Sequence, residues 1–287
     1  MIQAPRSPAP AIRGTTTIIA HLGHPTESFK APMIYNPYFA DRGIDAVVVP
    51  MGCRAPDYPE FLRLLFRLSN IRGALITMPH KVTTAGLLDR VSTTAQVAGA
   101  CNAVRVGADG RLEGDMFDGE GFVGGMLRKG GVIRGARALV VGCGGVGSAI
   151  AASLARAEVG ELALFDTNAA TMEALAGRLR QLYPRLGLTT GSTDPGGRDI
   201  VVNATPLGMK EGDPMPVDVS LIAPETFVGE VVMTREITPF LAAVRARGCA
   251  FQIGTDMLFE QIPAYLDFFG LPATTADELR RLAQIQY

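Results

Sequence analysis

The stretch ARALVVGCGGVGSAIAASLARA, residues 136–157, decides the fold. A short apolar run leads through a glycine-rich turn into small residues at helical spacing, which predicts a strand, a loop and a helix. Its glycines form G-x-G-x-x-G, in which the first permits a tight turn, the second lets backbone approach a pyrophosphate, and the third allows close helix–strand packing. The stretch therefore predicts a Rossmann-type dinucleotide-binding unit. The loop residues expected to contact the cofactor are Gly142, Gly144, Gly145, Val146 and Gly147.

Asp166 indicates which dinucleotide is bound. It ends the next apolar run, residues 161–166, and follows Gly147 by 19 positions. An acidic residue about 20 positions after the glycine pattern accepts hydrogen bonds from the ribose and would repel a 2′-phosphate. Thr167 and Asn168 follow it, with no Arg nearby. We therefore predict NAD as the cofactor and keep NADP as possible. A helix N-cap is the alternative role for Asp166.

Outward from this unit, short apolar runs alternate with segments of helical periodicity. Further strands are predicted at residues 16–23, 45–52, 73–79, 199–204, 227–232 and 249–254. Further helices are predicted at residues 32–40, 59–69, 120–128, 168–182, 238–247 and 256–269. This order is typical of α/β layers with parallel strands. Within residues 99–118, Asp109-Gly110 predicts a turn between two short antiparallel strands.

The composition excludes several classes of function. The 27 Lys and Arg nearly balance the 28 Asp and Glu, so we expect neither a nucleic-acid nor a membrane partner. The four cysteines and three histidines lack metal-ligand spacing, and we predict no metal site. Residues 1–14 contain no apolar stretch, which predicts a frayed leader rather than a secretory signal and hence a cytoplasmic protein. We expect a monomer or a homodimer.

Three polar residues follow predicted strands in the first half of the chain. Lys81 ends the segment ITMPHK, Asn102 lies in CNAV, and Asp118 lies in GDMFDGEG. The carboxyl ends of strands in α/β sheets are where ligands usually bind. A Lys–Asp pair facing a nicotinamide can exchange the proton of an alcohol while hydride is transferred.

The set of motifs resembles the shikimate/quinate dehydrogenase family from about residue 16 onward. The matching pieces are TMPHK, GACNAV, the D-G-x-G of GDMFDGEG, GCGGVG, NATPLGM (203–209), TPFL (238–241) and GTDMLFEQ (254–261). The resemblance implies an α/β fold with a substrate-binding domain at residues 1–119, completed by C-terminal helices at 255–287. It also implies a Rossmann NAD(P)-binding domain at residues 120–254 and a substrate cleft between the two.

The resemblance also implies roles for individual residues. Lys81 and Asp118 match the catalytic pair. Thr77, Asn102 and Gln261 match residues on the wall that hydrogen-bonds the substrate ring. The remaining cofactor-side positions are Asn203, Thr205, Gly254 and Met257.

The departures from the family pattern concern the substrate carboxylate. The family carries S-x-S-P before its first helix, and the aligned stretch here is Phe29-Lys30-Ala31-Pro32. Two further polar positions have become Phe117 and Met233. Apolar side chains offer an anion no hydrogen bond, and an unpaired buried carboxylate is costly. We therefore predict an NAD-preferring oxidoreductase that acts on a ring secondary alcohol other than shikimate, such as a cyclic polyol or a hydroxy acid.

Two alternatives remain open. The chain is a genuine shikimate or quinate dehydrogenase if Ser28, Lys30 or Arg235 holds the acid instead. It is a metabolite-sensing regulator if the fold binds ligands without catalysis, although the retained Lys81 and Asp118 argue against this. His21 and His24 border the altered positions, where they either touch substrate or lie at the surface.

Overall fold

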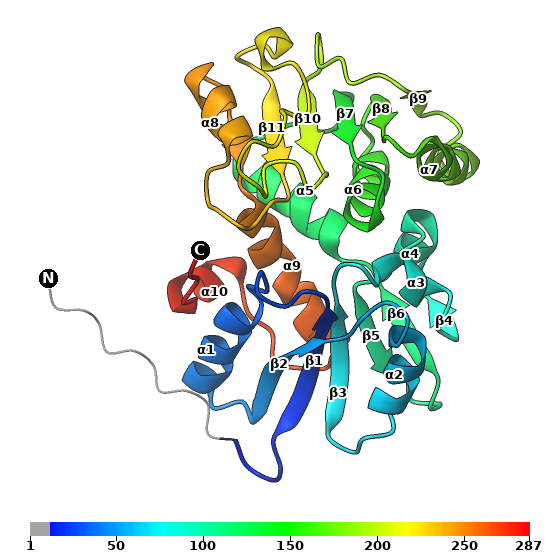
Figure 1. Cartoon of the computed structure of the whole chain (residues 1–287), viewed down its shortest axis with the longest axis vertical. Helices are drawn as coiled ribbons and strands as arrows, with labels where there is room; N and C mark the ends of the chain where they lie inside the picture. The colour runs from blue at the N-terminus through cyan, green and yellow to red at the C-terminus, as the bar shows by residue number, and fades with distance from the viewer. Residues whose placement is uncertain (1–11) are drawn as a thin grey trace, which may run out of the picture.

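The computed structural model describes residues 12–287, whose strands form two six-stranded sheets (Figure 1). Helices cover both sheets, so the predicted α/β class is confirmed. The predicted leader lies almost entirely at residues 1–11, outside the described residues. In the part of the chain that is described, no helix has both the length and the apolar character needed to cross a membrane.

The first sheet consists of three parallel strands, an antiparallel hairpin and a short edge strand that runs parallel to the second strand of the hairpin. Its strands are β1 (Thr17–Gly23), β2 (Ala46–Gly52), β3 (Ile71–Ile76), β4 (Arg90–Val91), β5 (Ala103–Val106) and β6 (Leu112–Asp115), and its helices are α1 (Pro32–Arg42), α2 (Tyr58–Leu65), α3 (Lys81–Ala85) and α4 (Thr93–Ala98). The strand order is β2-β1-β3-β5-β6-β4. Successive side chains of a strand point to opposite faces, so Ile19 of β1 packs in the core under α1 while Leu22 packs in the core under α2.

The second sheet is parallel throughout. Its strands are β7 (Arg137–Val141), β8 (Glu161–Phe165), β9 (Gly187–Thr190), β10 (Ile200–Asn203), β11 (Phe227–Glu230) and β12 (Phe251–Gln252), and its helices are α6 (Gly145–Arg156), α7 (Ala169–Leu182), η1 (Val219–Leu221) and α8 (Pro239–Ala246). The order is β12-β11-β10-β7-β8-β9. Parallel sheets are buried on both faces, and Leu139 and Val140 of β7 accordingly enter two different cores.

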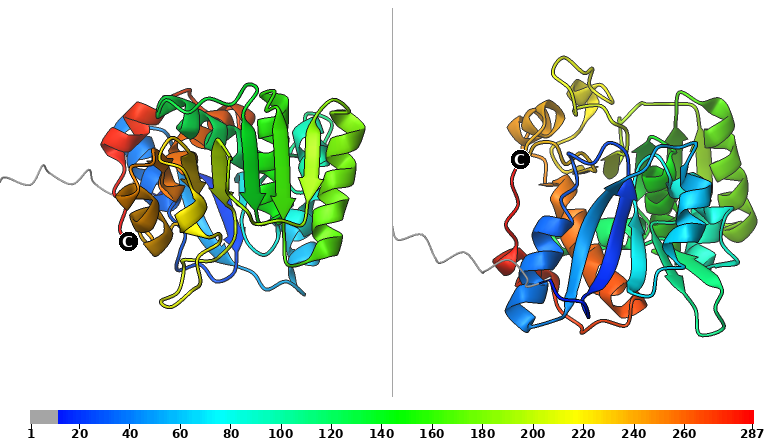
Figure 2. Two further views of the ribbon diagram at one scale, coloured as in Figure 1. Left: turned by 90° about the horizontal axis from the view of Figure 1, so that it is seen from above. Right: turned by 60° about the horizontal axis from the view of Figure 1, so that its bottom comes forward.

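Two helices, α5 (Asp118–Arg128) and α9 (Gly254–Phe268), connect the two sheets, and α10 (Ala276–Leu282) packs on α1 and α9. Figure 1 shows α9 passing from the second sheet back to the first, and both views in Figure 2 agree. Met257 near its start belongs to a core of the second sheet, whereas Ile262 one turn later belongs to the core under α1. The predicted domain boundary at residue 119 falls at the start of α5, and the division into two domains stays a prediction.

Several short elements escaped the sequence-based prediction. They are α3, β4, α4, β9 and η1, all too brief to display a period. In α4 the signal is a cap: Ser92 Oγ accepts a hydrogen bond from Ala95 N at 3.1 Å, and Gly99 ends the helix at φ 63°. The predicted helix at residues 59–69 was too long, because α2 ends at Leu65.

Candidate active site

A cavity of about 570 Å³ lies where the carboxyl ends of the strands of both sheets meet. One wall comes from the first sheet, with α1 and α9, and the other comes from the loops that follow β7, β8, β10 and β11. Ligands of α/β proteins bind at this end of the strands, so the cavity is the candidate active site. The predicted site residues that line it are Phe29, Ala31, Thr77, Lys81, Asp118, Gly142, Gly144, Gly145, Val146, Asp166, Thr205, Met233, Met257 and Gln261.

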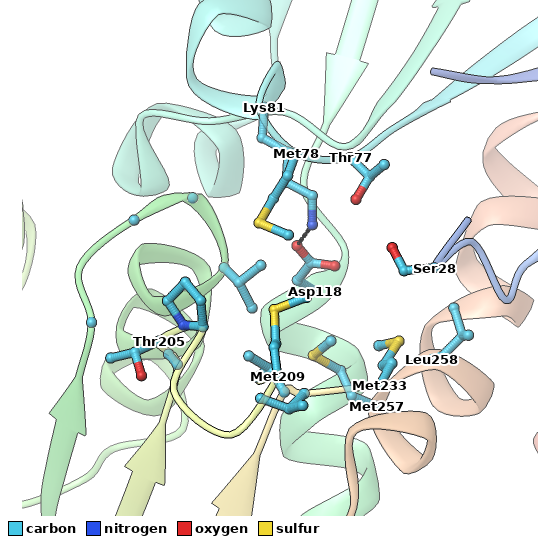
Figure 3. A pocket seen from close by; sticks show the side chains of 18 of the residues that line it. Ser28, Thr77, Met78, Lys81, Asp118, Thr205, Met209, Met233, Met257 and Leu258 are labelled. Atoms are coloured by element: carbon cyan, nitrogen blue, oxygen red, sulfur yellow. Dashed lines mark hydrogen bonds and ion pairs between the residues drawn. The ribbon is translucent and has the colours of Figure 1, made fainter. Parts of the chain in front are cut away.

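Lys81 and Asp118 meet in the middle of this cavity (Figure 3). Lys81 begins α3 after β3, Asp118 begins α5 after β6, and the Lys81 ammonium donates a hydrogen bond to Asp118 Oδ2. Their side chains are 11% and 3% exposed. The start of a helix favours a carboxylate through the helix dipole. The fold thus places a shielded acid–base pair at the cavity, and its catalytic role stays a prediction.

The glycine loop forms a cradle at the other wall. Gly142 has φ +99°, and a Cβ on Gly147 would lie 1.8 Å from the Gly142 carbonyl oxygen, so α6 can approach β7 only because Gly147 is a glycine. Gly144 is the N-cap of α6 without a side-chain cap, and the space beside it is open. The first N–H groups of a helix have no partner within it, and Gly144 and Gly145 line the cavity. The start of α6 therefore fits the pyrophosphate of a nicotinamide dinucleotide.

Asp166 lies at the end of β8 and lines the cavity next to this loop. Its carboxylate accepts hydrogen bonds from Cys143 N at 2.7 Å and from Asn168 N at 2.8 Å. The N-cap of α7 is Asn168, which accepts from Thr171 N at 3.2 Å, so the N-cap alternative for Asp166 is wrong. A carboxylate has about four lone-pair sites, and Asp166 therefore keeps acceptor capacity for a ribose.

Comparisons with known proteins agree with this geometry. The model of the shikimate dehydrogenase substrate binding domain matches residues 22–104, and that of the ThiF family matches residues 128–178. The shikimate dehydrogenase (NADP(+)) of Rubrobacter xylanophilus is 36% identical over a stretch that covers 88% of this chain and 90% of the relative. The chain belongs to the shikimate dehydrogenase family.

Solved structures of this family superpose over nearly the whole chain. The shikimate 5-dehydrogenase of Listeria monocytogenes, in complex with shikimate and NAD, has a TM-score of 0.84 at 25% identity and covers 95% of this chain and 98% of its own. The quinate dehydrogenase of Corynebacterium glutamicum, in complex with NAD, has a TM-score of 0.82 at 28% identity and covers 93% of this chain and 98% of its own. The predicted resemblance is thereby confirmed.

Two side-chain amides near the Lys81–Asp118 pair of this shikimate dehydrogenase family member have unused hydrogen-bonding groups. Asn102 is fully buried; its Oδ1 accepts from Phe117 N at 3.0 Å, and its Nδ2 has no partner among residues 12–287. Gln261 lines the cavity, and its Oε1 also lacks a partner in the described chain. Asn102 is not among the lining residues, whereas Thr77 is. That these side chains bind the ring hydroxyls stays a prediction.

The four altered positions do not all lie at the cavity. Phe29, Ala31 and Met233 line it, as expected for a changed substrate subsite. Phe117 is not among the lining residues and packs in the core under α1, with its ring centroid 4.9 Å from that of Tyr265. Core packing is therefore the observed environment of Phe117.

Asn203 holds the loop that follows β10 in place. It is fully buried, donates to Leu207 O and to Glu230 Oε2 at 3.0 Å each, and accepts from Thr205 Oγ1 at 2.6 Å. Burial raises the pKa of Glu230, while hydrogen bonds from Asn203 and Thr238 oppose this rise. This network shapes the loop that brings Thr205 to the cavity.

Three further predicted cofactor residues differ in placement. Met257 lines the cavity, whereas Gly254 and Gly147 are not among the lining residues. A Cβ on Gly254 would lie 2.2 Å from Val232 O, so this glycine allows α9 to begin close to the strand end. The observed geometry gives Gly147 and Gly254 packing roles beside the site.

Sequence reasoning missed several residues of the cavity. Met78, Met209 and Leu258 line it, and Figure 3 shows the methionines around the Lys81–Asp118 pair. All three belong to motifs quoted for the family, so adjacency to a motif was the available signal. Tyr35 also lines the cavity, but a tyrosine on the buried face of a helix has no such signal. Among residues 12–287 there is no group of three or more His, Cys, Asp or Glu that could hold a metal ion.

Proposed function

We propose that this protein is an NAD(P)-dependent oxidoreductase that transfers hydride reversibly between a ring secondary alcohol and nicotinamide. The observation that carries the proposal is the buried Lys81–Asp118 pair, which lies in the same cavity as the glycine loop. Curated relatives in the family are named shikimate dehydrogenases, which supports the same reaction class.

The side chains divide the work of this reaction. When bound, NAD(P)⁺ supplies the hydride acceptor. Lys81 and Asp118 exchange the hydroxyl proton of the alcohol, since a positioned pair of this kind acts as general acid and base. The backbone at the start of α6 binds the pyrophosphate, and Gln261 orients the substrate ring. Met209 and Met233, which are half-buried at the cavity, shield the reacting carbon from water, which strengthens the electrostatic interactions there.

We further propose that NAD is preferred over NADP. Asp166 lines the cavity with Thr167, and both oxygens of its carboxylate already hold the loop in place. A 2′-phosphate beside this carboxylate would be repelled. The names of the curated relatives specify NADP(+), whereas the Listeria and Corynebacterium structures contain NAD. Cofactor choice is therefore a property of each member's own residues.

Shikimate is proposed to be a poor substrate. Phe29, Ala31 and Met233 give the cavity wall no hydrogen-bonding side chain at those positions. Lys30 lines the cavity, but its ammonium donates to the carbonyl of Gln286. Arg235 is exposed and is not among the lining residues. A small cyclic polyol without a carboxylate fits this wall better.

A substrate screen tests the proposal directly. The full chain is mixed with NAD⁺ or NADP⁺ and a panel of cyclic polyols and hydroxy acids that includes shikimate and quinate, and cofactor reduction is followed by absorbance. Oxidation of at least one ring alcohol, with NAD⁺ faster than NADP⁺, is expected. Cofactor binding without turnover of any ring alcohol would instead favour a metabolite sensor.

A further inference from the structure

β1 and α1 bring two polar side chains to the first-sheet wall of the cavity. Alternate residues of a strand share a face, so His21 lies on the same face of β1 as Ile19, which packs in the core under α1. Tyr35 of α1 belongs to that core. Both His21 and Tyr35 line the cavity. The fold thus places an imidazole and a phenol at the wall opposite the glycine loop.

Three buried polar atoms at this wall have no hydrogen-bond partner among residues 12–287. They are Nδ1 of His21, the hydroxyl of Tyr35 and Oε1 of Gln261. The three side chains come from β1, α1 and α9, and they are only 8%, 1% and 4% exposed. Nearly all buried polar groups in folded proteins are hydrogen-bonded. Three exceptions that line one cavity therefore indicate a ligand that supplies the missing partners.

The charge at this wall favours a neutral ligand group. Burial and the nearby Lys81 lower the pKa of His21 to about 3, so the imidazole is uncharged at neutral pH. Its ring stacks on Phe29 with the centroids 4.1 Å apart. The Lys30 ammonium already donates to Gln286 O. A carboxylate bound here would give up its hydration shell. In exchange it would contact only uncharged side chains and the Lys30 ammonium, which already has a hydrogen-bond partner, and this exchange is costly.

We propose that His21, Tyr35 and Gln261 form a subsite that hydrogen-bonds an uncharged hydroxyl group on the substrate ring, across the cavity from the glycine loop. A hydroxyl both donates and accepts, as do a phenol and a neutral imidazole, so it can pair with any of these side chains. The substrate class is therefore a cyclic polyol that carries a hydroxyl, rather than a carboxylate, on a ring carbon other than the reacting one. This inference rests on the proposed function.

The experiment compares two substrates that differ by one hydroxyl. Cyclohexane-1,4-diol carries a second hydroxyl across the ring from the reacting one, and cyclohexanol lacks it. The ratio of kcat/KM for the diol to that for cyclohexanol is measured with NAD⁺ for the wild type, Tyr35→Phe and His21→Asn. One hydrogen bond corresponds to about a tenfold change, so we expect the ratio to fall about tenfold in each variant, mainly through KM of the diol.

Tyr38→Phe is the matched control. Tyr38 is also buried on α1, but its hydroxyl donates to Pro272 O at 3.1 Å and it does not line the cavity. This variant loses a buried tyrosine hydroxyl as Tyr35→Phe does, and it should leave the ratio unchanged. A ratio that falls equally in Tyr35→Phe and Tyr38→Phe indicates a general loss of packing and overturns the subsite.

The remaining outcomes separate the subsite from the proposed function. An unchanged ratio in both Tyr35→Phe and His21→Asn overturns the subsite while the enzyme assignment stands. A larger loss for shikimate than for the diol in Tyr35→Phe shows that the wall recognises an acid, and also overturns it. If the wild type oxidises neither of these alcohols nor any other ring alcohol of the substrate screen, the proposed function fails. Calorimetric titration with the diol then tests the subsite alone. The subsite proposal requires the diol to bind more weakly to Tyr35→Phe than to Tyr38→Phe.

Discussion

The two walls of the cavity recognise ligands by different means. At the second sheet, the ligand-facing donors are backbone N–H groups at the start of α6, and side chains such as Asp166 are already hydrogen-bonded within the loop. At the first sheet, the ligand-facing groups are side chains, and those of His21, Tyr35 and Gln261 have unpartnered atoms. The polar groups that the second sheet offers a ligand are therefore main-chain donors, whereas those of the first sheet are side chains.

This difference separates what the family shares from what each member changes. A backbone cradle needs only glycines at fixed spacing. The second-sheet wall of the cavity, the predicted cofactor wall, therefore tolerates substitutions at positions other than these glycines. A side-chain wall changes its preference whenever a side chain changes, as Phe29 and Ala31 illustrate. The cofactor wall therefore identifies the family, and we expect the first-sheet wall, the predicted substrate wall, to determine which substrate is preferred.

Removing the catalytic pair should give the largest effect. Lys81→Ala and Asp118→Ala are each expected to lower kcat about 10²- to 10⁴-fold, because general acid–base catalysis contributes that much. Lys81 lies beside Gly145 of the glycine loop, but Lys81→Ala keeps the Cβ that packs there, and the Lys81 ammonium bonds to Asp118 rather than to the loop. The Kd of NAD⁺ should therefore hardly change. Steady-state kinetics and cofactor titration measure the two quantities. A variant that keeps wild-type kcat at saturating substrate would remove that residue from the proton transfer.

Restoring the family residues should reverse the preference of the substrate wall. The double variant Phe29→Ser, Ala31→Ser places two hydroxyls at the cavity, and a hydrogen bond to a charged group contributes roughly 1.5–3 kcal/mol. We expect kcat/KM for shikimate to rise about 100-fold and that for the native ring alcohol to fall. Competition assays with both substrates measure the change. Efficient shikimate oxidation by the unmodified protein would contradict the proposed wall.

The sequence predicted the cofactor wall better than the substrate wall for a physical reason. The glycine pattern and Asp166 form one local stretch whose geometry follows from backbone conformation, and the structure places this stretch as expected. The substrate wall is assembled from β1, α1 and α9, which are far apart in sequence. Tyr35 looked like an ordinary core residue, and Phe117, expected at the cavity, packs in the core instead. The shortest elements were missed because they are too short to show a hydrophobic period. α4 has fewer than two helical turns, and β4 has only two residues.

The buried imidazole of the substrate wall should leave a signature in acid stability. Burial and Lys81 lower the pKa of His21 from 6.5 to about 3. Between these two pH values the imidazole binds a proton in the unfolded chain but stays unprotonated in the folded chain. Stability therefore rises with pH between about 3 and 6.5 and is unaffected by this group above that window.

Urea unfolding of the wild type and His21→Asn measures this contribution. From about pH 7.5 to about pH 5 the wild type should lose about 2 kcal/mol more stability than the variant. His24→Asn, a change at an exposed histidine, is the control and should behave like the wild type. If the free energy of unfolding depends on pH equally in the wild type and in His21→Asn, then His21 is solvated. The first-sheet wall would then lack the buried, unpartnered imidazole that distinguishes it from the second-sheet wall.

The smallest effect is expected at the cofactor wall, because its recognition is spread over backbone groups. Asp166→Asn keeps an oxygen for the hydrogen bond from Cys143 N but removes the negative charge beside the ribose. The repulsion between a carboxylate and a 2′-phosphate at a partly exposed site amounts to about 1 to a few kcal/mol, so the preference for NAD over NADP should narrow about tenfold. The ratio of kcat/KM for the two cofactors measures it, with Asp194→Asn at an exposed position as the matched control. If the wild type uses both cofactors equally, or if Asp166→Asn leaves the ratio unchanged, then side chains other than Asp166 choose the cofactor. The cofactor wall would then depend on specific side chains as the substrate wall does.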